Sequence, residues 1–134
     1  MVGETKMQKL IGAMKPALSA GVYVFATVPH GSPVPVSNAL MTFEEAEGKT
    51  LIMLSEAAEA AGLDATFRSR MITLNVHSSL DAIGFLARIT DALAKRAIPT
   101  NPVSGFFHDH LFVPEDRADE AMAALSALAA GDQP

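Results

Sequence analysis

The most regular pattern of hydrophobic and polar positions lies between residues 71 and 113. Apolar side chains occupy every second position from Ile72 to Val76, which predicts a strand with one apolar face that stops at His77. From Leu80 onward the apolar side chains recur at helical spacing until Pro99, so a helix should follow the strand. The segment is therefore predicted to begin with a strand, and a crossover helix should follow it.

A hairpin should come after this helix. Residues 101–107 and 110–113 have strand character, and His108–Asp109 between them predicts a tight reversal. A right-handed crossover leaves the first two strands parallel, so the third strand, antiparallel to both, should lie between them. The end of the first strand and the tip of the hairpin then meet at the same edge of the sheet.

The flanking sequence predicts a second set of elements before this β-α-β-β unit and one helix after it. These are a helix over residues 4–20 that kinks or ends at Pro16, strands over 22–28, 38–43 and 50–54, and helices over 56–61 and 116–129. Ser55 and Asp116 are expected to cap the last two helices. No linker composition separates residues 64 and 71, so one long strand, or two strands with a bend near Ser69, should join the two halves.

Composition narrows the class of protein. With 134 residues, 49% of them hydrophobic, the chain suits one compact domain or two very small ones that share a core. The formal net charge of −5 and the lack of a basic run argue against nucleic-acid binding. No apolar stretch approaches the roughly 20 residues of a membrane span, and no signal peptide is visible. Because the sequence has no cysteine, we expect a cytoplasmic protein without disulfides or thiolate metal sites.

Several phrases of the sequence resemble a known family. The strand MITLNVH, the helical residues Gly84-Phe85-Leu86-Ala87 and the strand Leu111-Phe112-Val113 resemble the ACT domain, a β-α-β-β-α-β regulatory module often attached to amino-acid biosynthetic enzymes. The phrases VHSSLDAIGFLA, VSGFFHDHLFVP and AEGKTLIM resemble a small stand-alone family with two ACT-like halves, and this resemblance covers roughly the whole chain.

The resemblance implies an α+β fold. It consists of tandem ACT-like, ferredoxin-like halves, residues 1–66 and 67–134, with antiparallel sheets that carry helices on one face. Two features depart from the family pattern. ACT domains that bind amino acids commonly have an Asp followed shortly by Pro-Gly at the first strand–helix junction, where this chain has His77 to Asp81. The second half also has no strand after Ala129, so the first half should complete that sheet or leave it short.

Polar side chains gather at the predicted sheet edge. Ser78 is placed to cap the helix, and Asp81 three residues later resembles a capping box. A helix start offers backbone N–H groups to a carboxylate, while Asp81 would suit an ammonium group, so an amino acid fits this edge better than a phosphate. The predicted ligand-binding residues are His77, Ser78, Ser79, Asp81, His108, Asp109 and His110. The alternative is that these residues only cap a helix and form a turn.

Metal and catalytic chemistry are weaker interpretations of the same residues. His108 and His110 stand at positions i and i+2, and His77 could be a third ligand for Zn²⁺. A tight turn would rotate the two histidines apart, so we predict neither a metal nor another cofactor. Ser78 and Ser79 beside His77 do not suggest triad geometry, because sequence neighbours at a strand end rarely form one, and we predict no catalytic residue.

The predicted function is therefore a non-enzymatic sensor that binds a small molecule, most simply an amino acid, and passes the effect to a partner protein. One alternative is an interaction or assembly module without a metabolite, and a less favoured one is a metal protein that uses the histidine cluster. Phe106 and Phe107 should point to opposite faces of their strand, one into the core and one outward, and the outward ring is a candidate dimer contact. The resemblance implies a homodimer.

Overall fold

The computed structural model describes residues 6–33 and 37–131 and contains two compact units. One unit combines the described residues up to residue 20 with those from residue 70 onward, and the other consists of the described residues between 21 and 69. The spatial units thus differ from the division at residues 66 and 67, because the N-terminal segment packs with the C-terminal part of the chain. The division of the sequence into two ACT-like halves stays a prediction.

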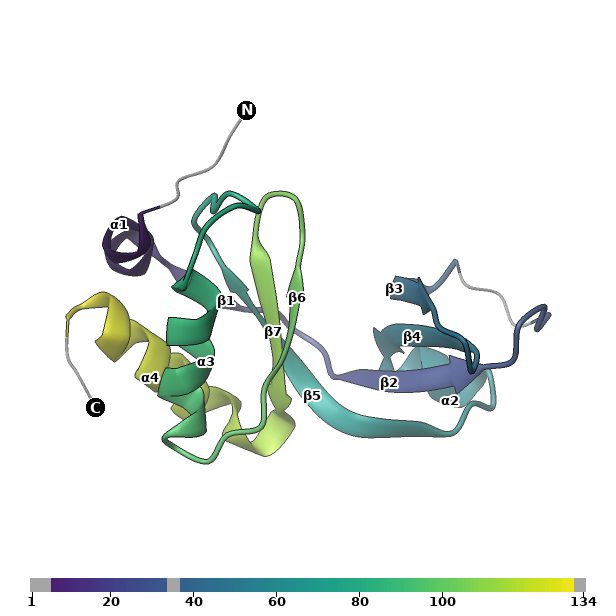
Figure 1. Ribbon diagram of the computed structural model, residues 1–134. Helices are drawn as coiled ribbons and strands as arrows, with labels where there is room; N and C mark the ends of the chain where they lie inside the picture. The colour runs from purple at the N-terminus through teal and green to yellow at the C-terminus, as the bar shows by residue number, and fades with distance from the viewer. Residues whose placement is uncertain (1–5, 34–36, 132–134) are drawn as a thin grey trace. The chain divides into compact units, whose positions relative to one another are not determined.

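The larger unit is a sheet covered by helices on one face (Figure 1). Its sheet order is β1-β5-β7-β6. Its elements are α1 (Met7–Ala13), β1 (Pro16–Leu18), the C-terminal part of β5 (Ala65–Leu74), α3 (Phe85–Ala94), β6 (Asn101–Ser104), β7 (Asp109–Pro114), a 3₁₀ turn η1 (Glu115–Arg117) and α4 (Ala118–Ala129). The hairpin strand β7 lies between β5 and β6, which confirms the predicted strand order.

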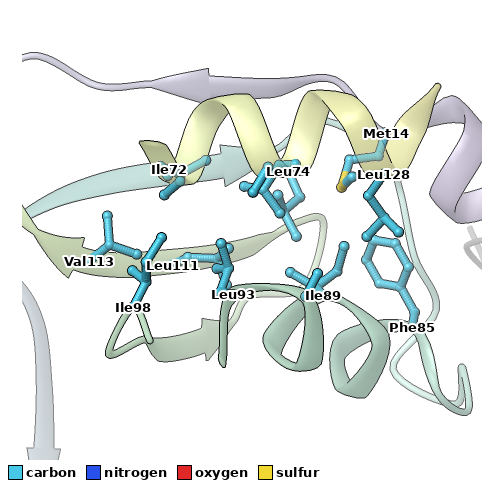
Figure 2. Packing of buried hydrophobic residues seen from close by; sticks show 14 of the residues in the cluster. Met14, Ile72, Leu74, Phe85, Ile89, Leu93, Ile98, Leu111, Val113 and Leu128 are labelled. Atoms are coloured by element: carbon cyan, nitrogen blue, oxygen red, sulfur yellow. The ribbon is translucent and has the colours of Figure 1, made fainter. Parts of the chain in front are cut away.

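The core of this unit follows from the alternation in its strands. Side chains at every second position point to the same face, so Ile72 and Leu74 of β5 enter the core, and Leu111 and Val113 of β7 join them. Figure 2 shows these side chains against Leu93 and other apolar residues of α3. All five are fully buried, and burial of one such side chain stabilises the fold by about 1.5–3 kcal/mol.

The smaller unit contains the strands β3, β4, β2 and the first part of β5, in this order, which belong to the same seven-stranded sheet as the strands of the larger unit. Its elements are β2 (Tyr23–Val28), β3 (Ala39–Glu44), β4 (Lys49–Leu54), α2 (Ser55–Ala60) and the N-terminal part of β5. Val24, Leu51 and Met53 form its core with Ala58 of α2, so the helix covers one face of this sheet as well. The α+β class with antiparallel strand pairing is confirmed, although the paired strands form one seven-stranded sheet and not a separate sheet in each half.

The strand β5 runs through both units, which confirms the prediction of one long strand. Its first residues pair with β2, and Ile72 to Leu74 pair with β1. An irregularity lies at Phe67, whose φ is +60°, between the paired residues Thr66 and Ser69. Such an extra residue bends a strand and increases its twist. The N-terminal segment thus supplies β1 to the larger unit, so the first half completes the sheet that the second half leaves short.

The predicted N-terminal helix was wrong in its length. Residues 4 and 5 lie outside the described part of the chain, α1 ends at Ala13, and Pro16 opens the short strand β1. Proline removes a backbone donor and clashes with the preceding helical turn, while its fixed φ is compatible with the first residue of a strand. The proline that was expected to kink or end a helix therefore lies after the helix, at the start of a strand.

The predicted serine and aspartate caps were also wrong. Helix α2 begins at Ser55 itself without a side-chain cap, and the Ser55 hydroxyl accepts a hydrogen bond from Arg68 at 2.9 Å. Asp116 belongs to η1, and α4 has no side-chain cap. Among the described residues, no helix has the length and apolar content that crossing a membrane requires.

Two glycines of the larger unit should respond oppositely to substitution by alanine. Gly84 precedes α3 with a φ of +88°, and a Cβ there would lie 3.3 Å from the sulfur of Met7. Gly84→Ala should lower the free energy of unfolding by about 1–2 kcal/mol, because left-handed backbone is unfavourable for alanine. Gly12 lies in α1 with open space around its Cβ position, so Gly12→Ala should be neutral or stabilising by up to about 1 kcal/mol. Urea denaturation of both variants measures the difference, and equal effects would contradict the backbone assignment at Gly84.

Candidate functional site

The segment from residue 75 to residue 84, here called loop 75–84, connects β5 to α3 without a serine-capped helix start. The Ser79 hydroxyl accepts a hydrogen bond from the Asp81 amide at 3.1 Å, and the Ala82 amide donates to the Ser79 carbonyl at 3.0 Å. These bonds close a local turn, so α3 begins at Phe85 and the predicted capping by Ser78 and Asp81 was wrong. Ser and Asp side chains satisfy nearby backbone groups in turns as well as at helix starts, and here the turn is favoured.

The hairpin reverses at residues 105–108, here called turn 105–108, and not at His108–Asp109. The Gly105 amide donates to the His108 carbonyl at 2.8 Å, and Ser104 pairs with Asp109 across the hairpin. A Cβ on Gly105 would lie 3.1 Å from that carbonyl oxygen, so glycine allows the strands to reverse closely. Asp109 is consequently the first residue of β7, one position inside the sheet.

The buried carboxylate of Asp109 joins the two segments. Its Oδ2 accepts a hydrogen bond from the Ser78 hydroxyl at 3.2 Å, and its Oδ1 accepts one from the Ser104 hydroxyl at 2.6 Å. Asp109 is 6% exposed and Ser78 is 8% exposed, so both are removed from water. Ser78 and Asp109 are 31 positions apart in the sequence, and their contact confirms that the end of the first strand meets the hairpin. We call these three residues the Asp109 clamp.

His110 lies beside the clamp in β7. Its Nδ1 is 2.9 Å from the Thr73 hydroxyl of β5, and its ring centroid is 6.4 Å from that of His108. Partial burial lowers the pKa of His110, the neighbouring His108 lowers it further, and Asp109 opposes the shift. Burial lowers the pKa of an imidazole because it disfavours the charged form.

An aromatic cluster forms the outer end of the two segments. The His77 ring lies 5.4 Å from Phe107 and 6.3 Å from Phe106, and the two phenylalanine rings are 5.0 Å apart. Phe106 is 60% exposed and Phe107 is 56% exposed. The prediction that one of them enters the core was wrong, because both lie in turn 105–108 and not on a strand with two faces.

The structure brings together most of the predicted ligand-binding residues, although in different roles. Ser78 and Asp109 are buried and bonded to each other, while Ser79 and Asp81 form the local turn. We call loop 75–84, turn 105–108 and the adjoining residues Asp109 and His110 the loop edge. Within the described residues, no three His, Asp or Glu side chains are grouped closely enough to hold a metal ion.

Sequence reasoning missed two supporting residues of the loop edge. Ser104 holds one oxygen of Asp109, and Thr73 contacts His110. Gly105 could have indicated the role of Ser104, because a reversal that starts at this glycine places Ser104 opposite Asp109.

The lowered pKa of His110 predicts a pH dependence of stability. The folded state binds the His110 proton more weakly than the unfolded state does. The stability that neutral His110 contributes is therefore fully present above pH ~6.5, and it is lost as the pH falls below this value. The free energy of unfolding should therefore fall more steeply between pH 7 and pH 5 in the wild-type protein than in His110→Asn. Denaturation across this range measures both slopes, and His108→Asn should give an intermediate slope. Equal slopes for wild type and His110→Asn would contradict the shift.

Known families and solved structures resemble this chain in sequence and in fold. Two family models of the ACT domain match residues 2–70 and 66–127. A search of curated protein sequences finds no match. Among solved structures, a Vibrio cholerae protein of unknown function, described as a possible transport protein, is 39% identical, with a TM-score of 0.83. The alignment covers 91% of this chain and 94% of that protein.

Two more distant structures show the same fold at low identity. An Agrobacterium tumefaciens protein is 16% identical over 87% of this chain and 89% of its own, with a TM-score of 0.73. The ligand-free regulatory subunit of aspartate kinase from Thermus thermophilus is 11% identical over 88% of this chain and 97% of its own, with a TM-score of 0.65. ACT domains are regulatory modules, and with two family models covering residues 2–127, this chain belongs to the ACT-domain family.

Proposed function

We propose that the protein is a non-enzymatic sensor that binds an amino acid or a similar small metabolite at the loop edge. The main support for this proposal is the Asp109 clamp. It holds loop 75–84 and turn 105–108 together, so side chains far apart in the sequence face solvent from one place. A ligand that touches both segments would stabilise their present arrangement, and a partner protein could respond to that change. The cysteine-free sequence favours action in the cytoplasm.

The side chains of the loop edge suit a ligand that carries both an ammonium group and a carboxylate. The exposed carboxylate of Asp81 would attract an ammonium group, and the imidazoles of His77 and His108 would attract a carboxylate when protonated or donate a hydrogen bond when neutral. The helix dipole contributes less than the sequence suggested, because α3 begins at Phe85, four residues after Asp81. Recognition in this proposal rests on side chains.

A second candidate function is an interaction or assembly module. Leu80, Ile83, Phe106 and Phe107 are each 56–87% exposed, and all four belong to the loop edge. Exposed apolar groups that gather in one place typically mark an interaction surface. A homodimer through this surface is compatible with ligand binding, since the ligand would contact polar side chains of the loop edge and the dimer partner would contact these apolar ones.

A thermal-shift screen against the twenty amino acids tests the sensor proposal. A ligand that binds only the folded state at 100 times its dissociation constant should add about 2.7 kcal/mol of stability. The shift should be lost in Asp81→Asn, whose side chain is exposed and contributes little to folding. Asp119→Asn, an equally charged and exposed position on α4, should keep it. A thermal shift with divalent metals alone would support a metal-binding protein. No thermal shift with any compound would contradict the sensor proposal and favour the interaction module.

Sedimentation of the wild-type protein and of a Phe106→Ser/Phe107→Ser double variant tests the interaction surface. We expect a wild-type dimer whose dissociation constant rises at least tenfold in the double variant, because each buried phenylalanine contributes about 1.5–3 kcal/mol. Phe43→Ser removes an equally exposed ring from β3 and should leave the dimer intact. A monomeric wild-type protein, or dissociation by Phe43→Ser alone, would exclude this surface as the dimer contact.

A further inference from the structure

Three of the four histidines of the chain lie in the loop edge. The His77 ring lies 5.4 Å from Phe107, the Phe107 ring lies 6.5 Å from His108, and His108 lies 6.4 Å from His110. In Figure 1, loop 75–84 and the tip of the hairpin that carry this row of rings lie side by side at one end of the larger unit. Histidine is the side chain whose charge ordinarily changes between pH 5 and pH 8, so this edge concentrates groups that respond to pH.

The loop edge also has more groups for anions than for cations. Its residues include two acids, Asp81 and Asp109, and neither lysine nor arginine. Both carboxylate oxygens of Asp109, which is 6% exposed, already accept hydrogen bonds from serine hydroxyls, whereas Asp81 is exposed. One exposed carboxylate therefore stands beside three imidazoles, which donate hydrogen bonds. A ligand with one ammonium group and two carboxylates matches this set better than a neutral amino acid does.

The groups around His110 show how charge and protonation are linked at this edge. Partial burial and the neighbouring His108 lower the pKa of His110, and Asp109 opposes the shift. The adjacent strand β5 carries Arg70, whose guanidinium donates to a backbone carbonyl at 2.8 Å. An anion bound beside His108 would favour the charged form of the imidazoles and offset their mutual repulsion. Proton uptake would in turn strengthen the binding of the anion, because such coupling is reciprocal.

On the basis of the sensor function proposed above, we propose that the ligand of the loop edge is an acidic amino acid whose binding is accompanied by proton uptake at His77 and His108. Asp81 would bind the ammonium group, and the two imidazolium groups would bind the carboxylates through charge-assisted hydrogen bonds. The affinity should rise as the pH falls from 7.5 to 5.5, because imidazoles gain charge in this range. The side-chain carboxyl of a free acidic amino acid stays ionised there, since its ordinary pKa is about 4.

Calorimetric titration of the full chain with L-glutamate and L-aspartate, each compared with its amide, tests this specificity. At least one of the two acids should bind about tenfold more tightly at pH 5.5 than at pH 7.5 for each imidazole that must be protonated. Glutamine and asparagine replace one carboxylate by a neutral amide, so the matching amide should bind at least tenfold more weakly at pH 5.5. Circular dichroism at both pH values checks that the protein is folded.

The uptake of protons can be measured directly. Titration at pH 6.5 in two buffers with different ionisation enthalpies should show about half a proton taken up per bound ligand for each of the two histidines. His77→Asn and His108→Asn keep a hydrogen-bond donor that cannot be charged, so each should reduce the uptake and the double variant should abolish it. His30→Asn removes the fourth histidine, whose Nδ1 lies 3.1 Å from Glu44 in the smaller unit, and should leave the uptake unchanged.

Four results would overturn the proposal. These are equal affinity for acid and amide at pH 5.5, equal affinity for the acids at both pH values, unchanged proton uptake in the folded double variant, and tighter binding of a neutral amino acid than of either acid. The last result would leave the sensor function itself intact. Absence of binding for every amino acid at either pH would contradict the sensor function as well.

Discussion

The arrangement of the loop edge depends on the carboxylate of Asp109. A carboxylate removed from water is unfavourable by several kcal/mol unless donors compensate it, and here two serine hydroxyls do so. One hydroxyl comes from the adjacent hairpin strand and the other from loop 75–84. Displacement of the loop would leave one carboxylate oxygen without its donor. The clamp therefore converts a flexible connection into part of a defined surface.

The same constraint explains why apolar side chains can stay exposed at this edge. Phe106 and Phe107 lie at the tip of a hairpin whose base is fixed by Ser104 and Asp109, so neither ring can fold back into the core without breaking the pairing. The His77 ring packs against both and covers part of their surface. A polar ligand and an apolar partner would meet different parts of this edge, the first near Asp81 and the second at the tip.

All strands except β1 could be predicted, because their period of two is dictated by which face is buried. The turns around them could not, because the same residues serve several local purposes. The Ser78–Asp81 sequence fits a capping box, yet the buried partner Asp109, 31 positions from Ser78, withdraws its hydroxyl from capping. Pro16 fits a helix kink equally well as a strand start, and only the pairing of β1 with β5 selects the second. Long-range contacts decided these positions, and they are invisible in local patterns.

Gly84 links the loop edge to the helices that cover the sheet. It ends loop 75–84, its carbonyl accepts the hydrogen bond of the Arg88 amide at 3.0 Å, and a Cβ on it would lie 3.3 Å from the sulfur of Met7 in α1. The first turn of α3 therefore starts at a residue that lies close to α1. A movement of loop 75–84 at this end would disturb both the first hydrogen bond of α3 and the packing against α1, so the position of the loop depends on the helices as well as on the Asp109 clamp.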